Sequence, residues 1–135
     1  MSENLDLVRS IYAAWEHGDY GSFEWAHPEI EWDFAADGPT PELRTGVAEM
    51  EDTWRAYTSD FEETRHKADQ YIELDGERVL VLQHLSGRGK ASGLDLDRLQ
   101  SLGAAVLFHI RDGRVTRLIG YFDRANALAD LGLKE

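Results

Sequence analysis

The sequence predicts an α+β domain in which a curved antiparallel sheet wraps around helices from the first half of the chain. Apolar residues recur at helical spacing in much of the first 61 residues. The second half carries long runs of β-branched and aromatic residues, and two pairs of these runs are joined by Asp-Gly, a strong signal for a hairpin. Helices followed by long antiparallel strands are typical of the α+β class.

The size and composition of the chain limit its functions. Its 135 residues predict one domain, residues 1–135. A net charge of −12 opposes binding to nucleic acid or to an anionic membrane. The absence of cysteine excludes disulfides and thiolate chemistry. No apolar run approaches the roughly 20 residues that cross a bilayer, and the first residues do not resemble a signal peptide. We therefore expect a soluble, cytoplasmic protein.

The first elements follow from spacing and from cap residues. A first helix is predicted between Ser2 and Gly18, and its apolar face holds Leu5, Val8, Ile11, Tyr12 and Trp15. Asp19 can cap a short second helix that ends before Pro28, because the residue before a proline is pushed out of the helical region. Strict alternation then predicts a strand at residues 29–34, followed by a loop at 35–46 that can form a lid or rim.

The later elements are a third helix, two hairpins and a last helix. The third helix starts at Val47, and its apolar stripe is Met50, Trp54, Tyr57 and Phe61. The first hairpin turns about Asp75-Gly76 with Ile72 opposite Val79, and the second turns about Asp112-Gly113. The glycine-rich residues 86–93 are a strand end or a phosphate loop, and the extended pattern after them favours a strand end. Asp123 can cap a last helix at residues 124–131.

The second hairpin is predicted to form one wall of the core or of a pocket. If Arg111 lies opposite Arg114 and the side chains alternate regularly, Phe108 shares a face with Arg117, Ile119, Tyr121 and Asp123. The opposite face of this hairpin can pair with a second subunit.

Several short motifs, in this order and spacing, resemble the nuclear transport factor 2-like superfamily in its SnoaL-like and ketosteroid isomerase-like branch. They are residues 11–19, 27–33, 74–79, 111–115 and 121–124, with Gly46 before the third helix and an ending at residues 127–133. The resemblance covers nearly the whole chain. It implies a conical α+β barrel, or cystatin-like cone, that needs no cofactor. It also implies a hydrophobic pocket at the mouth of the cone and a homodimer through the outer face of the sheet.

The resemblance also implies positions for catalytic groups. The general-base aspartate of the ketosteroid isomerases falls on Asp33, the tyrosine of their oxyanion hole on Ile11 beside Tyr12, and their protonated aspartate on Val106. Each lost oxyanion donor typically costs on the order of 2.7 to 4 kcal/mol of transition-state stabilisation. Steroid isomerisation is therefore disfavoured. The SnoaL-like polyketide cyclases use a late-strand aspartate, and Asp123 is the one carboxylate in that strand.

Each candidate catalytic residue also has a structural interpretation. Asp33 is a base in an apolar pocket or a solvated residue at a strand end. Asp123 is a catalytic acid or a helix cap. Arg117 is a buried counter-ion or a rim residue that reaches water. His66 can assist Asp33, and a metal site shared with His84 and His109 is not expected, because regular alternation turns His66 alone inward.

The predicted function is binding of a small hydrophobic molecule, in a cofactor-free protein that is either an acid–base enzyme or a non-catalytic module. As an enzyme it would catalyse an isomerisation, aldol-type cyclisation, dehydration or epoxide hydration of a carbonyl-bearing or cyclic substrate. The alternative is a binding or dimerisation module. Convergence of Asp33 and a second titratable group on one cavity would favour the enzyme. The residues predicted to contact the ligand are Tyr12, Trp15, Trp54, Tyr57, Phe108, Arg117, Ile119 and Tyr121; core packing is the other interpretation of the aromatic ones.

Overall fold

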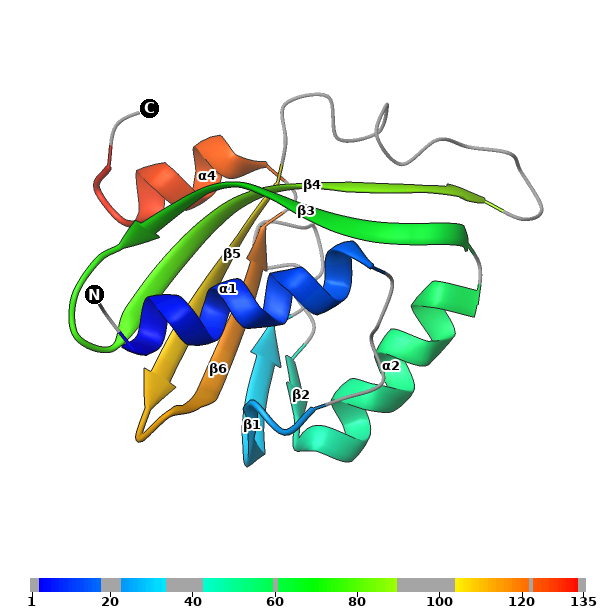
Figure 1. The fold of residues 1–135 in the computed structure, drawn as a ribbon, viewed down its shortest axis with the longest axis horizontal. Coiled ribbons are helices and arrows are strands. Elements are labelled where there is room, and N and C mark those ends of the chain that lie inside the picture. The colour runs from blue at the N-terminus through cyan, green and yellow to red at the C-terminus, as the bar shows by residue number, and fades with distance from the viewer. Residues whose placement is uncertain are drawn as a thin grey trace.

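The computed structural model describes residues 3–17, 23–33, 43–59, 61–89, 104–121 and 123–133 (Figure 1). For residues 54, 56–59, 61–66 and 85–89 it describes the backbone alone. The elements, in chain order, are α1 (Glu3–Glu16), β1 (Ala26–Asp33), β2 (Leu43–Thr45), α2 (Val47–Ser59), β3 (Phe61–Glu73), β4 (Arg78–Gly89), β5 (Ala104–Arg111), β6 (Arg114–Tyr121) and α4 (Arg124–Asp130). The α+β class is confirmed.

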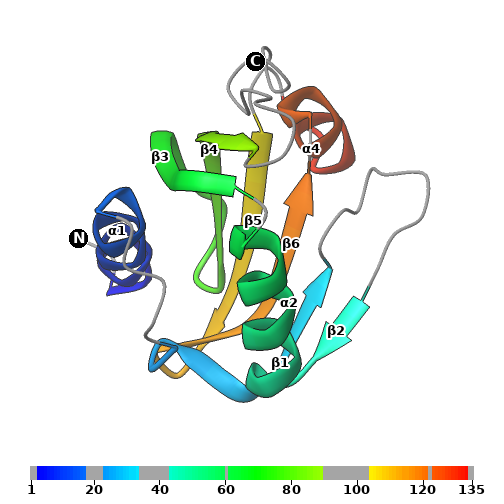
Figure 2. The same cartoon turned by 90° about the vertical axis from the view of Figure 1, so that its right-hand side faces the viewer.

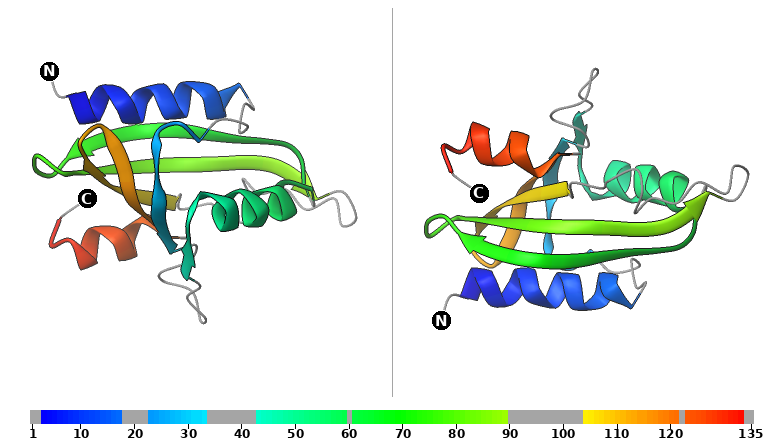
Figure 3. Two further views of the ribbon diagram at one scale, coloured as in Figure 1. Left: turned by 90° about the horizontal axis from the view of Figure 1, so that it is seen from below. Right: turned by 90° about the horizontal axis from the view of Figure 1, so that it is seen from above.

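The described strands form one curved sheet in the order β2-β1-β6-β5-β4-β3, antiparallel except for the parallel pair of β1 and β6. Figure 2 shows α1 and α2 inside the curve, and Figure 3 shows α1 and α4 on opposite sides of β3 and β4. We call the concave side of the sheet, with α1 and α2, the cup, and the other side the convex face. None of the helices in the described ranges has the length and apolar character that a membrane crossing requires.

The two sides of the sheet have separate apolar cores. The core in the cup consists of Val8, Ile11, Tyr12, Ala26, Ile30, Trp32, Met50, Val79, Val81, Phe108, Ile110, Val115 and Leu118. The core under α4 consists of Leu80, Leu82, Ala105, Leu107, Tyr121, Ala127 and Leu128. Because α4 covers part of the convex face, a second subunit on this face would contact the remainder. The homodimer stays a prediction.

The segment before β1 differs from its prediction. The sequence predicts a short second helix that ends before Pro28, but residues 24–25 form a turn and strand β1 already begins at Ala26. Pairing with β6 explains the difference, since the Val115 N–H donates to the Trp25 carbonyl at 2.8 Å. The register shifts between Ala26 and Glu31, and Pro28, which has no N–H to donate, lies within this irregular part. Asp19, the expected cap, lies outside the described residues.

The hairpin of β3 and β4 has a three-residue loop, so the predicted two-residue turn is wrong. The Leu74 N–H donates to the Arg78 carbonyl at 3.0 Å, and Ile72 lies opposite Leu80 instead of Val79. The Asp75 carboxylate explains the longer loop, because it accepts hydrogen bonds from the Glu77 N–H and from Arg78 Nε, both at 2.8 Å.

The hairpin of β5 and β6 has the predicted two-residue turn. Asp112 and Gly113 have φ values of 54° and 77°, the positive values that a type I′ turn needs, and Arg111 lies opposite Arg114. The regular alternation expected beyond the turn is wrong, because Ile110 pairs with Val115 and then His109 pairs with Arg117. The residue between them, Thr116, is therefore an extra residue in β6, a β-bulge.

Because of the bulge, each residue of β6 after Thr116 points to the side of the sheet opposite to the one that regular alternation predicts. Leu118, and not Arg117, lies opposite Phe108 and joins the core of the cup. Ile119 and Tyr121 pack with the core under α4 on the convex face. The predicted common face of Phe108, Arg117, Ile119 and Tyr121 does not exist.

The last helix follows its prediction. The Asp123 carboxylate accepts a hydrogen bond from the Ala125 N–H at 2.9 Å and caps α4. At the other end, Gly132 has a φ of 70° and its N–H donates to the Ala129 carbonyl at 3.1 Å.

We expect Asp123→Ala to lower the free energy of unfolding by about 1 kcal/mol, since an N-cap side chain of this kind typically contributes 0.5 to 2 kcal/mol. Asn caps helices about as well as Asp does, so Asp123→Asn should lose much less. Urea unfolding of both variants measures the difference. Equal losses in the two variants would show that the cap is not the main role of this carboxylate.

Candidate functional site

A buried polar pair lies inside the cup. Tyr12 comes from the buried face of α1, and Gln83 follows Val79 and Val81 on the concave side of β4. The Tyr12 hydroxyl donates a hydrogen bond to Gln83 Oε1, and the two residues are 0% and 5% exposed. A buried hydroxyl and a buried amide oxygen thus satisfy one another. Among the described core residues, Gln83 is the buried polar one that sequence analysis did not single out.

Three of the predicted ligand-binding aromatics meet beside this pair. The ring of Tyr12 lies 5.0 Å from that of Trp15 and 6.0 Å from that of Phe108, both at steep angles typical of edge-to-face packing. Tyr12 and Phe108 are fully buried, whereas Trp15 is half-buried. In this structure Tyr12 and Phe108 therefore form part of the core, and Trp15 retains exposed surface. The side chains of Trp54 and Tyr57 lie outside the described residues.

The floor of the cup beyond Phe108 is apolar and half-buried. Val106 follows Phe108 at the next concave position of β5, where it is half-buried and pairs with Val81 and Gly120. Gly120 contributes no side chain at this point of β6. The resemblance placed the oxyanion-hole aspartate at Val106. The position does face the cup, and it carries an apolar residue.

Asp33 lies on the convex face. It pairs with Leu43 of β2 and with Ile119 of β6, while its neighbour Trp32 packs in the core of the cup. Its Oδ1 atom is buried and has no hydrogen-bond partner among the described residues. Asp33 therefore does not converge with Tyr12 and Phe108 on one cavity. The side chain of His66, its predicted assistant, lies outside the described residues.

The predicted residue Arg117 lies in a cationic row on the convex face. Cross-strand pairing places Arg78, His109 and Arg117 side by side on β4, β5 and β6. Arg78 is paired with Asp75, whereas exposed Arg117 has no hydrogen-bond or ion-pair partner among the described residues. Partial burial lowers the pKa of His109, and the charges of Arg117 and Arg78 lower it further, against smaller opposing effects of Asp75 and Glu77.

A second polar cluster holds α4 on the sheet. Asp69 Oδ2 accepts a hydrogen bond from Arg124 at 2.8 Å and also pairs with His84 Nδ1. Arg124 donates in addition to the Gln83 carbonyl at 3.1 Å. Asp69 is the extra residue of a second bulge, between the pairs of Ala68 with Gln83 and of Gln70 with Leu82. No local sequence signal indicates such a bulge. Within the described ranges, no three potential ligand side chains gather to hold a metal ion.

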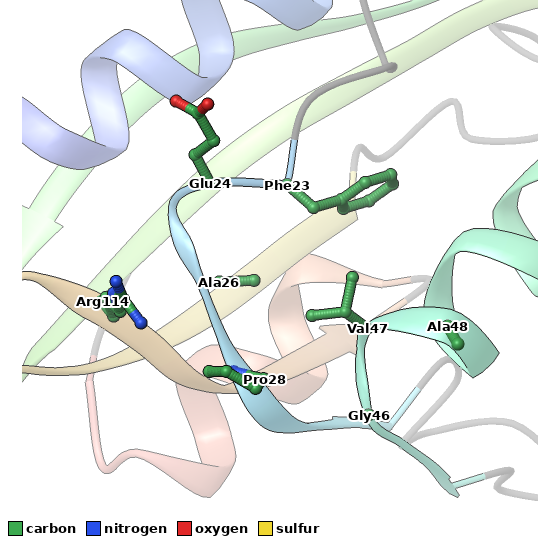
Figure 4. A pocket seen from close by; sticks show the side chains of 8 residues that line it. All are labelled: Phe23, Glu24, Ala26, Pro28, Gly46, Val47, Ala48 and Arg114. Carbon is green, nitrogen blue, oxygen red and sulfur yellow. The ribbon is translucent and has the colours of Figure 1, made fainter.

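A surface hollow of about 780 Å³ lies where β1, α2 and β6 begin (Figure 4). Its lining includes apolar Phe23, Pro28 and Val47 and charged Glu24 and Arg114. In Figure 4, Glu24 points away from Phe23 and Val47. None of the predicted site residues lines this hollow, although Phe23, Ala26 and Val47 of its lining also pack in the core of the cup.

A curved sheet that holds two helices in an apolar cup defines the cone-shaped α+β proteins. The chain belongs to the SnoaL-like domain family, whose model matches residues 8–118. A comparison with curated protein sequences finds no match.

Similar solved structures share this fold. An NTF2-like protein of unknown function from Burkholderia pseudomallei is 24% identical, with a TM-score of 0.73 over 96% of this chain and 97% of that one. TerC, co-crystallised with polyporic acid, is 23% identical, with a TM-score of 0.68 over 96% and 98% of the two chains. A candidate SnoaL-like polyketide cyclase from Jannaschia sp. CCS1 is 15% identical, with a TM-score of 0.72 over 98% and 94%.

The lowered pKa of His109 predicts a pH-dependent stability. Since the folded chain releases this proton more readily than the unfolded chain, whose histidines titrate near pH 6.5, the unfolded state binds more protons just below that pH. The contribution of His109 to stability should therefore rise with pH up to about 6.5. Urea unfolding across this range should show a smaller rise for His109→Gln. An identical rise in both proteins would contradict the assignment.

Proposed function

We propose that this chain binds a small, mainly apolar molecule in the cup, with the half-buried floor at Val106 and Gly120 as its contact surface. The proposal rests chiefly on the apolar character of this floor. The Trp15 ring and the neutral pair of Tyr12 and Gln83 lie on the same side of the sheet. Ligand sites of this kind are concave, mostly apolar and supplied with few polar groups.

Non-catalytic binding is the form of this function that the described residues favour. An isomerase of the ketosteroid type needs a base and an oxyanion hole directed at one substrate. Here Asp33 lies on the convex face, and Val106 and Ile11 stand at the two oxyanion positions. The TerC structure, crystallised with polyporic acid, adds a relative of this fold with a small organic ligand. The proposal calls for no cofactor.

Aromatic ketones, quinones and lactones are suitable probes, because they combine an apolar body with a carbonyl group. We expect at least one of them, for example 2-acetylnaphthalene, to raise the melting temperature and to change tryptophan fluorescence, since a ligand that binds only the folded state stabilises it. Val106→Phe should weaken its binding at least about tenfold, or about 1.4 kcal/mol, by filling the floor of the cup.

Ile119→Phe is the matched control, because it adds the same ring to a half-buried position on the neighbouring strand but on the convex face. It should leave the affinity unchanged. Equal weakening by the two variants would place the ligand outside the cup. Failure of the whole probe set to bind the unmodified chain would count against the proposal itself.

A second candidate function is proton transfer at Asp33, and the observation that favours it is the unpartnered Oδ1 atom. A buried polar atom without a partner typically costs about 1 to 3 kcal/mol. Such a cost is often retained where a substrate supplies the missing hydrogen bond. The substrate would then approach the convex face between Leu43 and Ile119.

We expect Asp33→Val to raise the free energy of unfolding by about 1 kcal/mol, because it removes the unsatisfied oxygen from a strand position that suits valine. Urea unfolding tests this. A loss of stability would show that the oxygen has a partner and would remove the basis of the second candidate. Once a turnover assay exists, Asp33→Asn should abolish turnover if Asp33 is the base, and should leave binding in the cup unchanged.

A further inference from the structure

The convex face carries an arrangement of charge that the proposed function does not use. Arg78, His109 and Arg117 are direct cross-strand neighbours, one row beyond the row of Leu80, Leu107 and Ile119 that faces α4. Like charges placed opposite one another on a sheet are destabilising. The next exposed pair toward the turn, Arg111 opposite Arg114, repeats this pattern. In a chain with a net charge of −12, the row places two arginines on either side of a histidine, with Asp75 paired to Arg78 and Glu31 next to Arg117 on β1.

The arginines of the row have donors available. Arg78 uses its Nε atom for Asp75 at 2.8 Å, which holds the side chain in place and leaves its two terminal nitrogens. Arg117 has no hydrogen-bond or ion-pair partner among the described residues, although Glu31 is its neighbour on β1. The strand spacing puts the backbones of Arg78 and Arg117 about 10 Å apart, on either side of His109. Two long side chains can therefore converge over the imidazole from both sides.

We propose that Arg78, His109 and Arg117 form a binding site for a doubly charged oxyanion, of the kind found in inorganic phosphate and phosphate monoesters. Planar guanidinium groups match the geometry of such oxygens and bind them with charge-assisted hydrogen bonds. A dianion supplies a counter-charge to Arg117 and acceptors for the terminal nitrogens of Arg78, and it relieves the repulsion within the row. This site is separate from the cup, which lies on the other side of the sheet.

His109 makes binding dependent on pH. The groups that face it are Arg117 and Arg78, which favour its neutral form, and Asp75 and Glu77, which favour its charged form. A bound dianion adds negative charge and hydrogen-bond acceptors, so it raises the pKa of His109. By linkage, the oxyanion binds more tightly as the pH falls through the titration of His109.

Sulfate is the first probe, because it stays doubly charged across the pH range in which histidine titrates. The imidazole signals of His109 in the full chain are followed by NMR during addition of sodium sulfate, with sodium chloride holding the ionic strength constant. We expect a saturable change and a rise in the pKa of His109. A change that does not saturate, or that chloride alone reproduces, would overturn the proposal.

Arg117→Gln tests the residue that has no described partner. It should weaken sulfate binding at least about tenfold, or about 1.4 kcal/mol. In sulfate-free buffer it should also raise the pKa of His109, which verifies that the two residues are neighbours in the folded variant. Arg55→Gln is the matched control, because Arg55 is exposed on α2 and paired with Glu51, and it should bind sulfate as the unmodified chain does. If Arg117→Gln bound sulfate as tightly as the unmodified chain does, the proposed site would be wrong.

Inorganic phosphate and glycerol 2-phosphate then identify the source of the anion. Tighter binding of the ester indicates an organic molecule that carries the phosphate group, and equal binding indicates the free oxyanion. Binding of neither, under conditions in which the chain remains folded, would overturn the proposal. Because the cup is not involved, Val106→Phe should leave all these affinities unchanged, so this test and the test of the cup fail independently.

Discussion

The arrangement of this molecule depends on one extra residue in β6, Thr116. Without that bulge, Arg117 would lie opposite Phe108, which is fully buried in the cup. An unpaired charge in such a core is far more costly than a local interruption of the strand ladder. With the bulge, Arg117 reaches solvent and Leu118 takes the inward position. The same shift directs Ile119 and Tyr121 toward α4. One bulge thus determines which residues of β6 pack in each of the two cores.

The two faces of the sheet are also joined through a single residue of β4. The Gln83 side chain accepts a hydrogen bond from Tyr12 in the cup, while its backbone carbonyl accepts one from Arg124 of α4. Arg124 is in turn held by Asp69, which a second bulge adds to β3. Helices α1 and α4, on opposite sides of the sheet, are therefore both hydrogen-bonded to the same residue of β4. A substitution of Gln83 removes the acceptor for Tyr12, and it leaves in place the backbone carbonyl that Arg124 binds.

Local signals in the sequence predicted the elements that depend on local chemistry. The apolar face of α1, the turn at Asp112-Gly113 and the cap at Asp123 each need only a few adjacent residues, and each is confirmed. The bulges at Asp69 and Thr116 were not predictable in this way, because they follow from pairing with distant strands and from the cost of burying Arg117. Alternation separated Trp32 from Asp33, but only the register with Leu118 and Ile119 shows which of them faces the cup.

The division of polar groups between the two faces follows from this register. Asp33, His109 and Arg117 lie on the convex face, whereas Arg44 and Tyr71 lie on the concave side, around the apolar floor and the neutral pair of Tyr12 and Gln83. The net charge of −12 repels anions at long range, but this repulsion is screened over about 8 Å at physiological ionic strength. Within that distance of the row lie its own two arginines and the carboxylates of Asp75, Glu77 and Glu31. Contact between the guanidinium groups and a dianion therefore depends on the row and these neighbouring carboxylates, and not on the charge of the whole chain.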